Sequence, residues 1–122
     1  MFASIVVGTD GSQTAGEAVR QAVALAKQLG ARLDIVSAYE PVSGARLREA
    51  SEQAEAAGVE TAVYARQGDP ADAILDVAEE RGADLIVVGN KGMTGAKRFL
   101  LGSVPNKVSH HAPCSVLIIR TT

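Results

Sequence analysis

A junction that recurs three times constrains this chain most: a helical segment ends, a glycine follows, and a short apolar run begins. The copies read LGARLDIV, AGVETAV and RGADLIV, with their glycines at Gly30, Gly58 and Gly82. Glycine readily adopts the left-handed conformation that closes a helix, so each junction marks a change from helix to strand. Helices that alternate with strands in this way predict an α/β fold with a parallel sheet.

Five apolar runs have the length of strands, and segments of helical periodicity separate them. The runs cover residues 5–7, 33–36, 59–65, 85–88 and 116–119. The first and fourth are apolar throughout, as in central strands, whereas the third alternates as an edge strand does. With right-handed crossovers, residues 1–122 are predicted to form one domain, a Rossmann-like open sheet of order 3-2-1-4-5 with helices on both faces.

Two helix starts carry capping signals. Thr14 stands three residues before Glu17, the spacing of a capping box, and Asp69 precedes Pro70, which suits the first turn of a helix. We therefore expect Thr14 and Asp69 to cap the first and third helices.

Charge is distributed unevenly along the 122 residues. Residues 1–84 hold all 14 acidic side chains and seven basic ones, while residues 85–122 hold five basic side chains and no acidic one. A basic segment in an acidic domain favours a small anion and argues against a broad nucleic-acid surface. Chance fluctuation in a short chain explains the same split, so the charge alone leaves both interpretations open.

Nothing in the sequence indicates export or a membrane. Cys114 is a single cysteine that can form no internal disulfide, and the N-terminus does not resemble a signal peptide. No apolar run approaches the roughly 20 residues of a membrane-spanning helix. We expect a cytoplasmic protein that does not span a membrane.

Glycine-rich polar segments follow the first and fourth strands. These strands are neighbours where the strand order reverses, which is where ligands bind in such folds. Backbone amides can approach phosphate oxygens closely at three positions of the second segment: Gly89, Gly92 and Gly102. Ser103 then opens the last helix, whose N-terminus favours an anion, while Asp10 suits the hydroxyl or amine donors of a nucleoside.

The glycine spacing matches neither the G-x-G-x-x-G fingerprint nor a P-loop. Residues 89–102 can also be interpreted as a flexible surface loop, with Ser103 only a helix cap. Physical reasoning leaves this alternative open beside the phosphate site.

The spacing Gly89-x2-Gly92-x9-Gly102-Ser103 resembles the G-2x-G-9x-G-S/T motif of the universal stress protein family, in its ATP-binding branch. The likeness runs through the chain, from IVVGTDGS at its start to HHAPCSVLII near its end. The resemblance implies a sheet of order 3-2-1-4-5 and dimers joined at the last strand. It also implies ATP as the ligand, or ADP or AMP in its place, with Mg or Mn held through phosphates and water.

Carried over position by position, the resemblance implies which residues form the site. Thr9 and Asp10 would contact the adenosine, and Ala38 would line the adenine pocket through its backbone. Positions along the triphosphate complete the set: Val88, Gly89, Gly92, Gly102, Ser103 and Val104.

Two features depart from the family pattern. Pro105 stands where members often carry Ser or Thr, so one hydroxyl contact to phosphate is missing. The connection between Glu40 and Gly58 is shorter than usual, so either the loop that could cover the adenine is shortened or a stretch of it is absent.

The last strand, from Ser115 to Arg120, would be an apolar edge with no helix after it. Such edges are usually covered by pairing with another chain, so the sequence independently predicts a homodimer through this strand.

Other polar residues invite chemical roles that their placement disfavours. His110, His111 and Cys114 lack a fourth ligand, so we expect no metal site, and we expect the histidines to contact the last carbonyls of the final helix. The acidic residues at 69, 72, 79 and 80 lie in or beside the third helix and are expected at the surface. Tyr39 could pack on adenine or simply against the sheet.

Three functions remain open on the sequence. The prediction is a regulatory or stress-response module whose ATP-bound state a partner reads, because no base is positioned to activate water and no catalytic residue stands out. A slow ATPase or phosphotransferase would use Asp10 or Ser103 in the same pocket. A dimeric interaction protein would need no nucleotide, and its glycine loop would be structural only.

Overall fold

Strand and helix alternate along the chain. The computed structural model describes residues 2–9, 13–37, 44–90 and 103–120. The elements, in chain order, are β1 (Ser4–Gly8), α1 (Gln13–Leu29), β2 (Arg32–Ser37), α2 (Gly44–Ala56), β3 (Thr61–Ala65), α3 (Pro70–Arg81), β4 (Leu85–Gly89), α4 (Ser103–His111) and β5 (Ser115–Ile119). All strand pairs are parallel and the order is β3-β2-β1-β4-β5, so the predicted fold class and strand order are confirmed.

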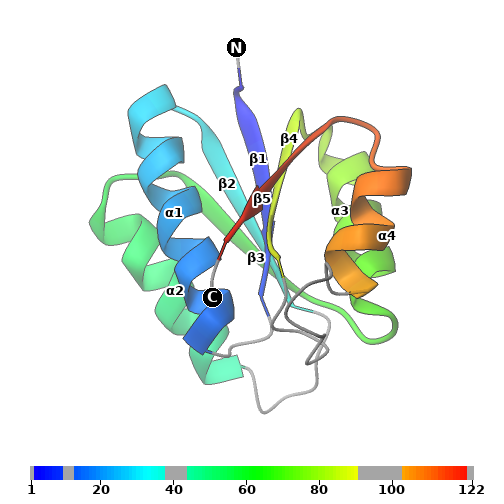
Figure 1. Ribbon diagram of the computed structural model, residues 1–122. Coiled ribbons are helices and arrows are strands. Elements are labelled where there is room, and N and C mark those ends of the chain that lie inside the picture. The colour runs from blue at the N-terminus through cyan, green and yellow to red at the C-terminus, as the bar shows by residue number, and fades with distance from the viewer. Residues whose placement is uncertain (1, 10–12, 38–43, 91–102, 121–122) are drawn as a thin grey trace.

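Helices cover both faces of the sheet. Figure 1 looks along the sheet from its β5 edge, with α1 and α2 in one layer and α3 and α4 in the other. Alternate residues of β1 enter different cores, since Ile5 and Val7 pack under α1 and α2 while Val6 packs under α3 and α4. This two-sided burial explains why the central strands are apolar at every position.

The three repeated junctions have the predicted geometry. Gly30, Gly58 and Gly82 have φ angles of +67°, +82° and +65°. In each junction the amide after the glycine donates to the carbonyl five residues earlier, at 2.9 to 3.0 Å. This pattern closes the helix and turns the chain into the next strand.

The start of α3 is also as predicted. The Asp69 carboxylate accepts a 3.0 Å hydrogen bond from the amide of Asp72, and Pro70 is the first helical residue. The side chain therefore satisfies an amide that the helix itself leaves unpaired.

The predicted cap of α1 is wrong. The helix begins at Gln13, so Thr14 lies inside the first turn instead of preceding it. The Glu17 carboxylate contacts Arg20 and Gln21 in the same helix. Partners three and four residues away on one helix face account for the position of Glu17 without a capping box.

The edge strand β3 is shorter than its apolar run. It begins at Thr61, while Val59 lies before it and is only 6% exposed. Val59 is apolar because it packs in the core under α1 and α2, and the alternation that follows it is that of the edge strand.

A charged network lies at the amino ends of the strands. Asp34 of β2 is fully buried, and its Oδ2 lies 3.5 Å from the Nε atoms of both Arg32 and Arg81. Arg32 also donates to Ser4 Oγ at 2.7 Å and to the Arg81 carbonyl at 3.0 Å. Asp84 accepts two backbone amides of the N-terminal segment at 3.0 and 3.1 Å, which joins the start of β1 to the turn before β4.

Candidate functional site

The carboxyl ends of β1 and β4 lie side by side. Their register runs from Ile5 opposite Leu85 to Val7 opposite Val87, so Gly8 and Gly89 end neighbouring strands. The next strands, β2 and β5, lie on opposite sides of this pair. The strand order therefore reverses at this point, as the sequence predicted.

Buried hydroxyls occupy the same edge. Thr9, directly after β1, is 5% exposed, and its amide donates to the Val36 carbonyl at 2.9 Å. Ser37, the last residue of β2, is fully buried. Ser37 was not among the predicted site residues, although a hydroxyl directly after an apolar run, at the edge where ligands bind, was the available signal.

The glycine-rich segment after β4 begins beside the end of β5. Val88 is 1% exposed, so its side chain belongs to the core and only its backbone faces this edge. Gly89 ends β4, and the amide of Asn90 donates to the Ile119 carbonyl at 2.8 Å. This bond holds the first residue after β4 against the end of β5, and sequence reasoning had missed Asn90.

The segment ends at the start of α4. Ser103 is its first residue, and the next two residues are buried, Val104 in the core shared with α3 and then Pro105. Proline at this position removes no helical hydrogen bond, because the first-turn amides lack intrahelical partners. Figure 1 shows that α4 starts near the carboxyl ends of the strands and runs back toward their amino ends.

The structure describes five of the nine predicted site residues and places them at this edge: Thr9, Val88, Gly89, Ser103 and Val104. Four predicted site residues lie outside the described part of the chain: Asp10, Ala38, Gly92 and Gly102. The fold thus brings together the ends of β1 and β4 and both ends of the glycine segment.

Lys107 of α4 has carboxylate partners on α3. Its Nζ lies 3.0 Å from Asp72 Oδ1 and 3.3 Å from Asp69 Oδ2, and these hydrogen bonds raise the pKa of Lys107. Both carboxylates are about half exposed, as predicted for the surface. Their further role, holding α4 against α3, was not predicted from the sequence.

His110 and His111 end α4, and Cys114 directly precedes β5. Within residues 2–9, 13–37, 44–90 and 103–120, no group of three His, Cys, Asp or Glu side chains could hold a metal ion. His110 Nδ1 lies 2.8 Å from the carbonyl of Asn106, the fourth residue of α4, so this contact is not to the last carbonyls that the sequence predicted. Cys114 is half-buried, and burial raises the pKa of its thiol.

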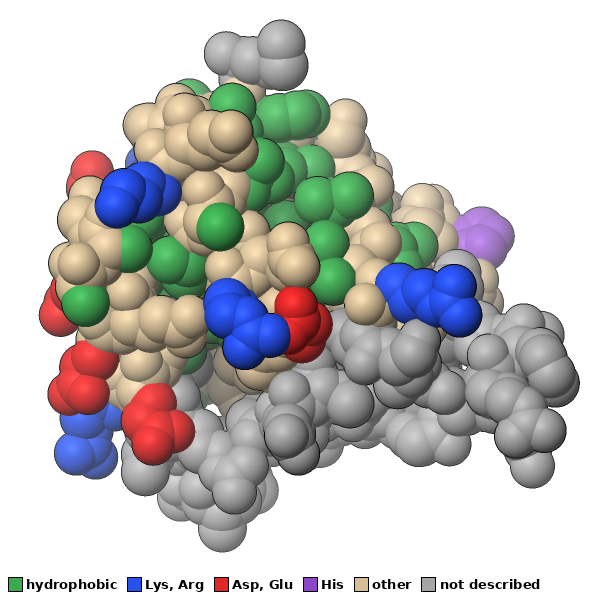
Figure 2. All heavy atoms as spheres, turned by 60° about the vertical axis from the view of Figure 1, so that its left-hand side comes forward, with side chains coloured by type: hydrophobic (Ala, Val, Ile, Leu, Met, Phe, Trp, Pro, Cys, Tyr) green, Lys and Arg blue, Asp and Glu red, His purple; other side chains and the backbone are tan. Residues whose placement is uncertain are grey.

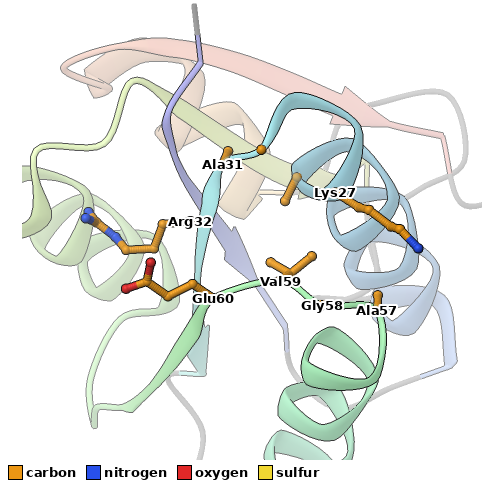
Figure 3. Close-up of a pocket in the computed structure, with 9 residues that line it drawn as sticks. Lys27, Ala31, Arg32, Ala57, Gly58, Val59 and Glu60 are labelled. Carbon is orange, nitrogen blue, oxygen red and sulfur yellow. The ribbon is translucent and has the colours of Figure 1, made fainter.

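A hollow of about 300 Å³ lies at the opposite, amino end of β2 and β3. Residues of the first two glycine junctions line it, among them Ala31, Gly58 and Val59. Figure 3 shows the side chains of Lys27 and Arg32 extending in opposite directions. The glycine-rich segments that follow β1 and β4 lie at the other end of the sheet, so the candidate site remains the carboxyl edge.

Comparison with known proteins decides the family. The model of the universal stress protein family matches residues 1–55 and 40–120. The chain belongs to the universal stress protein family. Universal stress protein YxiE of Bacillus subtilis is 35% identical over 98% of this chain and all of its own length. Universal stress protein Rv1636 of Mycobacterium tuberculosis is 39% identical over 99% of this chain and 98% of its own.

A solved family structure carries a ligand. The crystal structure of a universal stress protein in complex with cAMP superposes with a TM-score of 0.85 and 41% identity. The match covers 99% of this chain and 98% of the other.

The relatives have a stretch that this chain lacks. The alignment with YxiE extends over 148 residues although it includes only 98% of the present 122. The two segments matched by the family model overlap at residues 40–55, which agrees with a shortened connection after Glu40.

Across the described residues, no helix is long and apolar enough to cross a membrane.

Proposed function

We propose that this universal stress protein binds an adenine nucleotide at the carboxyl edge of β1 and β4, with ATP as the ligand. The observation that carries the proposal is the position of the motif Gly89-x2-Gly92-x9-Gly102-Ser103. Its first glycine ends β4 and its serine begins α4, and both lie at the edge where the strand order reverses. The cAMP complex of the 41% identical relative supports a nucleotide at this fold.

The proposed contacts divide between the two ends of the nucleotide. Thr9 and Asp10 bind the adenosine, and the backbone at Ala38 lines the adenine. The phosphates meet amides at glycines of the motif and at the start of α4, where the helix dipole favours an anion. Val88 and Val104 contribute backbone groups only, because their side chains are buried in the core.

Residues 85–122 contain no carboxylate side chain, and Asp10 is assigned to the adenosine end of the nucleotide. Mg or Mn bound with ATP would therefore be held mainly by the phosphates and by water, which is how Mg²⁺ usually binds beside nucleotides.

The relative's ligand makes cAMP the second candidate. A single cyclic phosphate needs fewer amides than a triphosphate, and a motif that runs from Gly89 to Ser103 favours the longer chain. Native mass spectrometry of the freshly purified protein identifies a retained nucleotide by its mass. Equilibrium dialysis with labelled ATP, and cAMP as competitor, then ranks the two ligands.

Variants of the motif test the site. Gly92→Val with Gly102→Val should abolish ATP binding, because the added side chains keep the backbone away from phosphate oxygens. Gly16→Val is the matched control, since a Cβ at Gly16 meets nothing within 4 Å. No ATP binding by the parent protein at millimolar concentrations, or full binding by the double variant, would refute the proposed site.

We further propose that the protein acts as a homodimer through β5. The central residue of this edge strand, Leu117, is 39% exposed. Figure 2 shows hydrophobic side chains gathered on the face where α1 lies, and α1 packs beside β5. Partly buried Phe2, Leu25 and Ile119 extend the apolar surface. Sedimentation velocity should show a dimer that Leu117→Lys dissociates, and an unchanged mass for the variant contradicts this interface.

A further inference from the structure

The sheet has a second open edge, at β3. β3 pairs with β2 on one side, and no described strand lies on its other side. Its central residue, Val63, is 42% exposed, more than Leu117 at the β5 edge. The five residues TAVYA contain none of the lysines or prolines that usually protect edge strands from pairing.

The backbone of β3 presents a regular set of hydrogen-bonding groups at this edge. On the inner side, the Glu60 carbonyl accepts from the Leu33 amide at 2.9 Å. The Arg66 amide donates to the Ser37 carbonyl at 2.8 Å. Backbone groups alternate along a strand, so even-numbered residues face β2. The amides and carbonyls of the odd-numbered residues face the open edge: Thr61, Val63 and Ala65.

These groups are arranged symmetrically about Val63. In an antiparallel pair of two copies centred on Val63, the outward groups of Thr61 face those of Ala65 in the partner. All three outward residues of each copy then exchange hydrogen bonds, and the exposed Val63 side chains meet at the two-fold axis. A register shifted by one residue leaves some of these outward groups unpaired.

The charges that flank the strand fit the same register. Glu60 precedes β3 and Arg66 follows it, so each Glu60 lies opposite Arg66 of the other copy. Arg66 uses two N–H groups on Glu80, at 2.7 Å each, and its guanidinium carries five. Opposite charges directly across an antiparallel pair are favourable, and like charges are unfavourable.

We propose that the β3 edge binds a second copy of this chain through antiparallel pairing centred on Val63. The partner is identical because the strand complements itself in hydrogen bonding, apolar contact and charge. A single strand edge is small compared with a standard interface, so the association is weak and depends on concentration. It is distinct from the β5 contact, and the two together would join copies into an extended sheet.

Cysteine cross-linking tests the register directly. In a Cys114→Ser background, Val63→Cys places the two sulfurs opposite each other at the two-fold axis, within the Cα separation that a disulfide spans. Ala65→Cys is the matched control on the same strand and face, because its partner in this register is Thr61. Mild oxidation should give a covalent dimer for the first variant and none for the second. Equal cross-linking of both variants, or of neither, would overturn the proposal.

Charge reversal provides a second measurement that needs no disulfide. Glu60→Arg puts like charges opposite each other and should weaken the concentration-dependent association by about tenfold or more. The triple variant Glu60→Arg, Arg66→Glu, Glu80→Arg restores both the pair within the chain and the pair between copies, so it should recover the association. Sedimentation at rising protein concentration measures the association of the parent and of both variants. Circular dichroism verifies that the variants are folded. Association that is unaffected by Glu60→Arg contradicts the proposed pairing.

Discussion

Removing the cap of α3 gives a stability prediction with a defined size and pH dependence. In Asp69→Ala the amide of Asp72 loses its 3.0 Å hydrogen bond, while Lys107 keeps its contact to the Asp72 carboxylate. Loss of an N-cap costs about 1 kcal/mol, within a range of roughly 0.5–2. For a chain of this length, that lowers the melting temperature by about 4 °C.

The pH dependence follows from the carboxylate. The hydrogen bond from the Asp72 amide, and then the interaction with Lys107, lower the pKa of Asp69 in the folded state. A carboxylate whose folded-state pKa is lowered stabilises the protein above its unfolded pKa, about 3.9, and loses that contribution as the pH falls through the folded value. The difference between Asp69→Ala and the parent should therefore be constant from pH 7 to about pH 5 and shrink below about pH 4.

Urea unfolding followed by circular dichroism measures the difference, with Asp69→Asn as the control. Asparagine caps helices about as well as aspartate, so Asp69→Asn should lower the free energy of unfolding clearly less than Asp69→Ala does. If Asn and Ala destabilise equally, the cap hydrogen bond is not the source of the effect. The reasoning would also be refuted if the loss in free energy of unfolding caused by Asp69→Ala were the same at pH 3 as at pH 7.

Three further predictions concern packing, backbone and surface charge. Ile86→Ala, in the fully buried centre of β4, should lower the free energy of unfolding by about 2–5 kcal/mol in urea titration. Gly82→Ala should destabilise by about 1 kcal/mol because φ is +65° there, whereas Gly16→Ala, inside α1 and free of clashes, should stabilise by up to about 1 kcal/mol. The exposed Arg66–Glu80 pair should show a small coupling in a double-mutant cycle, and the coupling should vanish in 1 M salt.

The order of the sheet could be predicted because several local signals agreed. Gly30, Gly58 and Gly82 located the helix ends. The uninterrupted apolar runs of the first and fourth strands marked these strands as central, and the alternation of the third marked it as an edge strand. The Thr14 signal failed because a threonine three residues before a glutamate also occurs inside a helix, where the glutamate contacts residues that follow it. Sequence spacing alone cannot distinguish them, since the outcome depends on where the helix begins.

Contacts between elements far apart in the sequence could not be predicted. Asp34 lies in a strand that reads as apolar, and Arg81 becomes its neighbour only when α3 packs on the sheet. Lys107 belongs to the basic segment 85–122, whose charge is compatible with anion binding, yet it pairs with carboxylates of α3. The motif positions were predicted as a set because they follow neighbouring strands, and their roles toward a nucleotide stay predictions.

The proposed nucleotide segment begins beside the proposed dimer strand, with Gly89 paired to Ile119 in the sheet. The amide of Asn90, the first residue after β4, donates to the carbonyl of Ile119, the last residue of β5. A ligand bound along the glycine segment is therefore expected to act on the end of β5, beside which the segment begins. Binding free energies that are coupled must be coupled in both directions by the same factor. We expect ATP to change the dimer dissociation constant, and Leu117→Lys to change the ATP affinity correspondingly. Sedimentation with and without ATP measures the change in the dimer dissociation constant, and equilibrium dialysis with Leu117→Lys measures the change in ATP affinity. If ATP binding and dimerisation do not affect each other, the contact between Asn90 and Ile119 does not couple them.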